Sequence, residues 1–152
     1  MLPALAGPFP PWRGGIAQFS MRLEKALSLS TETRRITWSH LYPPFLFPGT
    51  SQFEPGEGRM HHADAFLHSC NPFTWPGSRR RIAALGSTAL VTQWWHPFFA
   101  PALLAGLPRP SMLPRAAVCH NVLPHEGFRL LDNPDHHFHC CNRKFPSSGF
   151  RR

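Results

Sequence analysis

GPFPPWRGGIAQF, residues 7–19, is the stretch on which the predicted fold rests. A short apolar run, residues 1–6, precedes it, and a helical pattern over residues 16–28 continues it. Strand, glycine turn and helix is an order in which backbone N–H groups at the helix start face a negatively charged ligand. Gly14 and Gly15 lack a Cβ, so a ligand can approach their backbone closely. An ordinary loop with two flexible glycines fits the pattern equally well, because isolated glycine pairs are common.

The helix expected after the glycines has an apolar face and a polar face. Its apolar residues recur three and four positions apart, which is the spacing of one helix face. The apolar face carries Ile16, Phe19, Leu23, Ala26 and Leu27, and the polar face carries Gln18, Arg22, Lys25 and Ser28. We therefore expect the first set to pack against the core.

Length and composition indicate one globular domain. The chain has 152 residues, and its 42% hydrophobic content is ordinary for that size. Eighteen prolines limit helix length and predict many irregular connections. The net charge of +8 comes from arginine, since there are only two lysines. Arginine binds phosphates through its forked donor, but a GC-rich genome that encodes arginine in place of lysine explains the excess equally well.

The four cysteines show no regular disulfide spacing. They are Cys70, Cys119, Cys140 and Cys141, and the last two are adjacent. The N-terminus has no basic region before its apolar run, and Pro3 interrupts that run, so it lacks the pattern of a secretory signal. We therefore expect reduced thiols in a cytoplasmic protein.

Residues 82–108 contain no charged side chain and are long enough to span a membrane. Pro97 and Pro101 interrupt this segment, and Gln93 and His96 lie near its centre. β-Branched residues come first and an alanine- and leucine-rich piece follows the prolines. This order favours a buried strand followed by a helix over a transmembrane helix.

The remaining pattern alternates strands and helices. Further strands are predicted at residues 34–40, 88–94 and 115–120, and helices at residues 60–69, 74–85 and 97–107. The strand at 115–120 is apolar enough to suggest burial on both faces. This alternation predicts an α/β fold, a parallel sheet with helices on both faces.

Ligands of such sheets bind beyond the carboxyl ends of the strands. Three segments are expected to share that edge and border one crevice: Gly14–Gly15, Trp94–Trp95–His96 and His120–Asn121. A strand-end histidine bonded to local backbone is the alternative for His120. Trp94 and Trp95 point to opposite faces if both lie in a strand, so at least one is expected in the core.

Three phrases of the sequence resemble one enzyme family. They are GPFPPWRGGIAQF at 7–19, NPFTWPGSRRRIAALGSTALVTQWWHPFFAPAL at 71–103 and AVCHNVLPHE at 117–126. Together and in this order they resemble the N-terminal domain of bacterial retaining glycosyltransferases of family 4. The resemblance runs from about Gly7 to Glu126, which is most of the chain.

The resemblance implies a Rossmann-like sheet that forms the N-terminal half of a GT-B fold. A second such domain would face it across a cleft. These enzymes transfer a sugar from a nucleotide-diphosphate donor to an acceptor, with retention at the anomeric carbon and without a further cofactor. The acceptor is a sugar or a lipid-linked molecule, so the expected location is the cytoplasm, with peripheral association at the inner face of the membrane.

The resemblance also implies roles for individual residues. Gly14 and Gly15 match the loop that faces the donor diphosphate, and Arg13 adds a positive charge beside it. His120 matches the histidine near the reacting sugar and is the catalytic candidate. The residues expected on the acceptor side of the cleft are Trp94, Trp95, His96, Asn121, His125 and Glu126.

The sequence departs from the family in two ways. The 152 residues contain no counterpart of the C-terminal GT-B domain with its acidic motif and nucleotide pocket, so this chain is expected to be inactive alone. Residues 1–128 would form an incomplete N-terminal domain, and residues 129–152 an irregular tail without helix or strand periodicity. A truncated or frameshifted gene would explain the tail. Its cluster of His136, His137, His139, Cys140 and Cys141 has metal-ligand types but no zinc-site spacing, and no metal site is predicted.

The alternative function is a basic, aromatic-rich module that binds nucleic acid or an acidic partner. The arginines are scattered along the chain and no known nucleic-acid motif is present, so no specific nucleic-acid partner is predicted. A dinucleotide oxidoreductase is excluded because the glycine spacing is not G-x-G-x-x-G. A phosphate-loop nucleotidase is excluded because no Gly-Lys-Ser/Thr occurs.

Overall fold

The structure is a computed structural model that describes residues 1–43, 51–54 and 63–121. Five strands and their connecting helices make up the described part of the chain. The strands are β1 (Pro3–Ala6), β2 (Arg34–His40), β3 (Ala65–His68), β4 (Ala89–Trp94) and β5 (Arg115–Cys119). The helices are α1 (Gly15–Ser28), η2 (Pro72–Thr74), α2 (Trp75–Ala83), η3 (Pro97–Phe99) and α3 (Ala100–Gly106).

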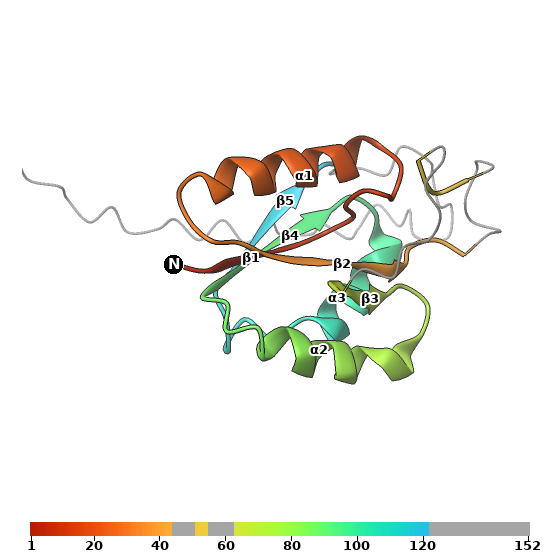
Figure 1. Cartoon of the computed structure of the whole chain (residues 1–152). Helices are drawn as coiled ribbons and strands as arrows, with labels where there is room; N and C mark the ends of the chain where they lie inside the picture. The colour runs from red at the N-terminus through yellow and green to blue at the C-terminus, as the bar shows by residue number, and fades with distance from the viewer. Residues whose placement is uncertain (44–50, 55–62, 122–152) are drawn as a thin grey trace, which may run out of the picture.

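All five strands are parallel and form one sheet in the order β3-β2-β1-β4-β5. Helix α1 lies over one face of the sheet, and α2 and α3 lie over the other (Figure 1). This confirms the predicted α/β architecture. Because all strands run the same way, their carboxyl ends meet at one edge of the sheet.

Strand β1 occupies the centre of the sheet and is completely buried. It pairs with β2 on one side and β4 on the other, with Ala4 opposite both Arg34 and Leu90. Pro3 is tolerated because it is the first residue of the strand, a position open to proline within sheets. The short apolar run at the N-terminus, although Pro3 interrupts it, therefore forms the middle of the described sheet.

The core on the α2 and α3 side of the sheet is built from aromatic rings. Phe99 is fully buried and lies 5.1 Å from the Trp38 ring and 4.4 Å from the Trp95 ring, measured between ring centroids. The Trp95 indole N–H donates to the Tyr42 hydroxyl at 2.9 Å. The buried Trp38 indole nitrogen, by contrast, has no hydrogen-bond partner among the described residues. Large buried aromatics contribute strongly to a domain core through the apolar area they remove from water.

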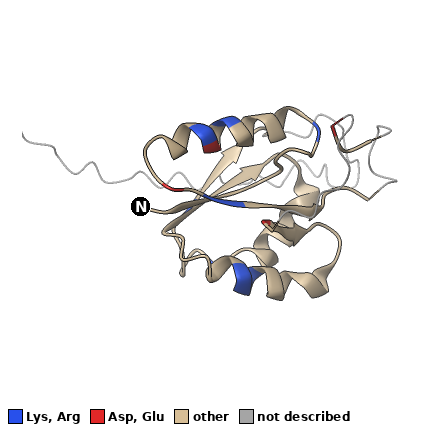
Figure 2. Ribbon diagram, viewed as in Figure 1, with Lys and Arg blue, Asp and Glu red and all other residues tan. Residues whose placement is uncertain are grey.

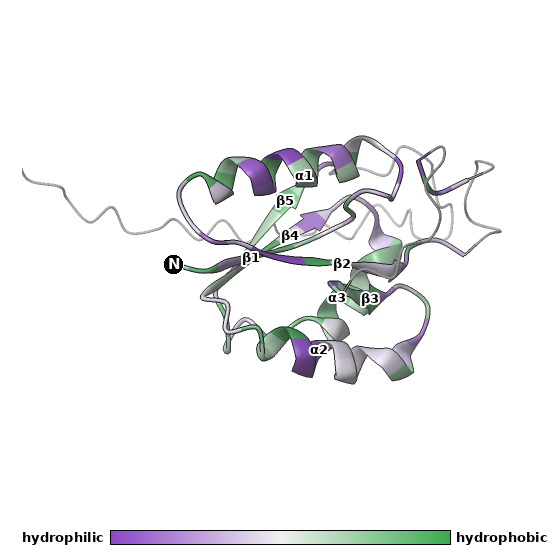
Figure 3. Cartoon of the chain, viewed as in Figure 1, coloured by the Kyte–Doolittle hydropathy of each residue, from purple (hydrophilic) through white to green (hydrophobic). Residues whose placement is uncertain are grey.

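The residues of helix α1 that are buried most completely are small, and the apolar face predicted for it is only partly buried. Ala17 and Ser20 are buried, whereas Phe19 is 41% exposed and Ala26 is exposed. The reason is close approach, because Ser20 packs directly above Gly7 at the end of β1. Figure 3 shows the mixed hydrophilic and hydrophobic positions along this helix. The predicted face was therefore wrong for two of its members.

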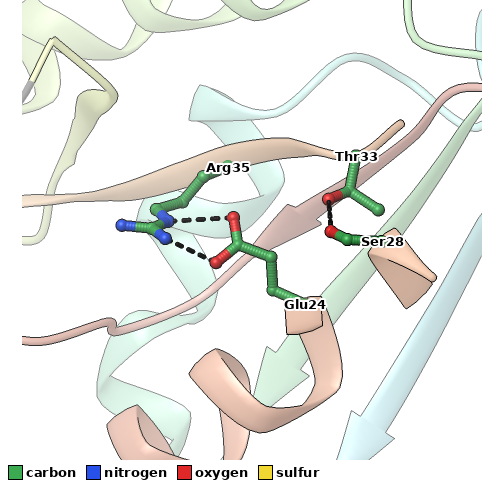
Figure 4. Close-up of polar contacts among 4 residues, drawn as sticks. All are labelled: Glu24, Ser28, Thr33 and Arg35. Atoms are coloured by element: carbon green, nitrogen blue, oxygen red, sulfur yellow. Dashed lines mark hydrogen bonds and ion pairs between the residues drawn. The ribbon is translucent and has the colours of Figure 1, made fainter. Parts of the chain in front are cut away.

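An ion pair joins α1 to the sheet beside β1. The Arg35 guanidinium donates to both carboxylate oxygens of Glu24, at 3.1 and 2.5 Å (Figure 4). One turn further along α1, the Ser28 and Thr33 hydroxyls lie 3.1 Å apart. A forked guanidinium–carboxylate contact fixes orientation as well as distance. The contact therefore holds the second half of α1 in one position relative to β2.

Most of the predicted elements are confirmed. The predicted strands at 34–40, 88–94 and 115–120 are β2, β4 and β5, and the predicted helices at 74–85 and 97–107 are α2 and the η3–α3 pair. The uncharged segment 82–108 contains a strand and a short helix, as predicted.

Two further sequence-based predictions, beyond the apolar face of α1, are wrong. The helix predicted at 60–69 is wrong, because the described part of that segment contains the strand β3. Burial of β5 on both faces is also wrong: Ala116, Ala117 and Cys119 are exposed, because β5 lies at the end of the described sheet.

Within the described ranges, no helix has both the length and the apolar character needed to cross a membrane. The predicted boundary near residue 128, the irregular tail and its histidine–cysteine cluster lie outside the described residues.

Candidate functional site

The candidate site lies at the carboxyl edge of the sheet, where β1, β4 and β5 end side by side. Gly7 follows β1, Trp95 follows β4 and His120 follows β5. Helix α1 begins at this same edge and runs back over the sheet (Figure 1). The three segments expected to share one edge therefore do so.

His120 is held in place by contacts with two other elements. Its Nε2 lies 2.6 Å from Oε1 of Gln93 in β4, and its backbone N–H donates to the Trp94 carbonyl at 2.8 Å. Its ring meets the Phe19 ring of α1 edge to face, with centroids 5.0 Å apart. The partly exposed imidazole thus sits between the end of the sheet and the first half of α1.

Burial lowers the pKa of His120 below the ordinary histidine value. The direction follows from the cost of placing an imidazolium in a poorly hydrated site. No described carboxylate offsets this cost among the contacts of the ring. The lowered pKa favours the neutral imidazole, which has one donor and one acceptor nitrogen.

Gly7 makes the packing around Gln93 possible. A Cβ at Gly7 would lie 2.5 Å from Gln93 Cγ and 3.2 Å from Ser20 Oγ. Gln93 itself is only 1% exposed. The glycine after β1 is therefore needed where the side chains of β4 and α1 converge beneath His120.

The start of α1 is open to a ligand. Gly14 is the N-cap residue, with φ 125, and no side chain accepts a hydrogen bond from the first turn. The first turn also contains no acidic residue. An added Cβ at Gly14 or Gly15 would meet nothing within 4 Å. The backbone N–H groups of this turn have no intrahelical acceptors, and they provide positive potential at an accessible surface.

The loop that leads to this helix start is fixed by residues 52–54. Arg13 N–H donates to the Gln52 carbonyl at 2.8 Å, and the Trp12 ring stacks on Phe53 with centroids 4.7 Å apart. The Trp12 indole N–H donates to the Trp38 carbonyl at 3.0 Å. The Arg13 side chain is exposed at this edge, so a charge stands beside the two glycines without a described ion-pair partner.

The double-tryptophan segment divides between core and surface. Trp95 is 7% exposed and belongs to the aromatic core described above, as expected for at least one of the pair. Trp94 is partly exposed. His96 caps η3, because its Nδ1 accepts from the Phe98 N–H at 3.1 Å. The structure thus gives Trp95 and His96 local structural contacts at the edge where cleft residues were expected.

The last expected site residues fall at the limit of the described chain. Asn121 follows His120 and is partly buried. His125 and Glu126 lie outside the described residues.

The described basic residues are spread along the backbone over α1, β2 and α2 (Figure 2). Within the arginine run of α2, the Arg79 guanidinium donates to the carbonyls of Leu104 and Leu107, each at 3.1 Å. The Arg81 guanidinium lies 4.5 Å from the centre of the Phe66 ring. Arg80 Nε donates to the Pro76 carbonyl at 3.5 Å, so all three arginines of this run have contacts within the fold.

In the described part of the chain, no group of three histidine, cysteine or acidic side chains is arranged to hold a metal ion. No protein-family model, curated protein or solved structure matches the chain.

Sequence analysis missed Gly7, Ser20 and Gln93 as members of this site. The signals in the sequence that could have indicated these residues are weak. Gln93 is a polar residue inside a predicted strand, Ser20 is a small polar residue in a predicted helix, and Gly7 directly follows the first apolar run. Each is weak alone, because the three positions are brought together only by the sheet order.

Proposed function

We propose that this chain is the acceptor-side half of a nucleotide-sugar glycosyltransferase that acts with retention and needs a C-terminal GT-B domain to complete its cleft. The observation that carries the proposal is the open start of α1, which lies at the same sheet edge as His120. A diphosphate-binding element and a polar side chain for the sugar are the two parts such a half-site needs.

The strand order supports a Rossmann-like assignment. The order β3-β2-β1-β4-β5 matches five consecutive positions of the doubly wound dinucleotide-binding sheet. In that architecture the turn after the first strand leads to a helix whose N-terminus receives phosphate groups. The turn of residues 7–14 and helix α1 stand in the same relation here.

The proposed chemistry depends on stabilising a departing nucleoside diphosphate. The N–H groups at the start of α1, with Arg13 beside them, supply positive potential that is in position before the reaction. His120 contributes a hydrogen bond to the donor sugar. The exposed part of Trp94 offers an apolar surface to a sugar ring or a lipid-linked acceptor. None of these roles requires a bound metal ion or a cofactor.

A binding experiment tests the diphosphate element directly. Titration of the ¹⁵N-labelled chain with uridine diphosphate should shift the amide signals of Gly14, Gly15 and Ile16. Gly15→Ala adds a methyl group where a ligand would approach, and it clashes with nothing in the chain. Gly77→Ala is the matched control, because it is the same change in another helix with equally open space.

Gly15→Ala should weaken the response at least about tenfold, a loss of about 1.4 kcal/mol, and Gly77→Ala should leave it unchanged. Shifts spread evenly over the chain, or equal responses of the two variants, would contradict the diphosphate site. Duplex DNA in place of the nucleotide tests the alternative function, which requires a steep dependence of binding on salt.

A turnover experiment tests the full proposal. The chain should be assayed with nucleotide sugars alone and fused to the C-terminal domain of a family 4 glycosyltransferase. Half a cleft cannot orient donor and acceptor together, so activity is expected only in the fusion. Absence of activity in fusions with several such domains, under conditions where the chain is folded, would count against the proposal.

A further inference from the structure

Gln93 is a buried amide whose only described hydrogen bond is to His120. Its side chain is 1% exposed, and its Oε1 lies 2.6 Å from His120 Nε2. A carbonyl oxygen only accepts hydrogen bonds, so the ring must supply the proton from Nε2. Loss of a bond by a buried amide costs free energy, because no water replaces the partner.

The surroundings leave Gln93 little freedom to take another position. Gly7 lies so close that a Cβ added to it would be 2.5 Å from Gln93 Cγ, and Ser20 Oγ closes the same space from α1. On the other side, the Phe19 ring contacts the edge of the His120 ring. Gly7 at the end of β1 and two residues of α1, Ser20 and Phe19, thus surround the contact. The contact itself joins the Gln93 amide oxygen to the His120 imidazole nitrogen.

We propose that Gln93 is a positioning residue that keeps the proton of neutral His120 on Nε2 and leaves Nδ1 as the acceptor of the ring. This rests on the proposed function, in which His120 meets the donor sugar. An acceptor nitrogen binds a sugar hydroxyl that donates its proton.

The test is the ring-proton signal of His120 in ¹H–¹⁵N spectra of the full chain at about pH 8, where an ordinary imidazole is neutral. A proton shared with Gln93 exchanges slowly with water, so an Nε2–H signal should be visible. His120→Gln identifies the signal by its disappearance. The Trp75 indole N–H, which donates to the His68 carbonyl at 2.7 Å, reports that the fold is intact.

Three variants separate positioning from simple packing. Gln93→Met keeps the length of the side chain but removes the acceptor, and it should speed exchange of the ring proton about five- to tenfold, the factor expected for one net hydrogen bond. Gln93→Glu restores an acceptor and should restore slow exchange. Gly7→Ala adds a methyl group that pushes the Gln93 side chain away from His120, so its ring-proton exchange should be as fast as in Gln93→Met. In the control Gly77→Ala the exchange rate should equal that of the unaltered chain.

Two results would overturn the proposal. One is a proton on Nδ1 in the unaltered chain, which would mean that the amide presents its N–H₂ group to the ring. The other is equal exchange in Gln93→Met and the unaltered chain while the Trp75 signal is retained. Neither measurement uses a nucleotide sugar, so failure here is distinct from failure of the glycosyltransferase proposal, which would appear as absence of diphosphate binding or turnover.

Discussion

Strands β1 and β5 are both short, small-residue segments of one parallel sheet, yet their surroundings are opposite. In β1, Ala4 and Ala6 have no exposed surface, because strands lie on both sides and helices cover the sheet. In β5, Ala116 and Ala117 are exposed, because the described sheet ends there. The difference teaches that the position of a strand in the sheet, and not its own apolar content, sets its burial.

The largest effect is expected when the same charge is added to an alanine in each strand. Ala4→Asp buries a carboxylate without a partner and should cost more than about 4 kcal/mol in the free energy of unfolding. Ala117→Asp should change it by less than about 0.5 kcal/mol, because the side chain meets water. Urea unfolding followed by tryptophan fluorescence measures both. If the two variants lost comparable free energy of unfolding, β5 would have to be covered in solution. The difference in burial between β1 and β5 would then be contradicted.

A smaller effect is expected where β1 ends. Gly7→Ala places a methyl group against Gln93 and Ser20 and should destabilise the fold by about 1–3 kcal/mol. Gly77→Ala in α2 should stabilise it by about 0.4–1 kcal/mol, since alanine favours helix and meets no neighbour. The same denaturation assay checks the opposite signs. A stabilising Gly7→Ala would mean that the centre of the sheet is less tightly packed than described.

The ion pair beside β1 should contribute less. The side chains of Arg35 and Glu24 are 33% and 18% exposed, so Glu24→Gln should lower the free energy of unfolding by about 1 kcal/mol. The exposed pair of Arg34 and Glu32 is the control, and Glu32→Gln should change it by less than about 0.5 kcal/mol. Unfolding at low and high salt should show screening mainly of the second pair. Equal losses would remove the distinction between the two pairs.

The smallest effect is expected at the end of β5. Burial lowers the pKa of His120 in the folded chain, so the unfolded chain binds the proton more readily. Stability should therefore be unaffected above about pH 6.5 and decline as the pH falls from there through the lowered pKa. His120→Asn should flatten this decline in unfolding curves recorded across that range. A steeper decline in the variant would contradict the assigned direction.

Local sequence signals predicted most of the helices and strands, but not which strands pair with each other. The β-branched run before Trp94 and the prolines at 97 and 101 predicted β4 and the helical turns after it, because these residues restrict backbone conformation locally. Strand β3 was missed because four residues, AFLH, carry too little period to distinguish strand from helix. The burial of β1 depends on pairing with residues about 30 and 86 positions away in the sequence, which no local pattern encodes.

The same limit applies to the candidate site. The rule for parallel sheets predicted the shared edge of the glycine turn, the tryptophan segment and His120 from the order of elements alone. The contact between Gln93 and His120 joins residues 27 positions apart on neighbouring strands. It depends on a register in which Gln93 lies opposite Val118, and the sequence does not specify that register.

The central place of β1 has a consequence for how the chain assembles during synthesis. Among the described strands β1 is made first, but one of its two partners, β4, begins only at Ala89. Until that later segment emerges, the first strand keeps an unsatisfied edge, and closing so long a loop is slow compared with forming a helix. The nascent chain is therefore expected to need protection from association with other chains until β4 has been made.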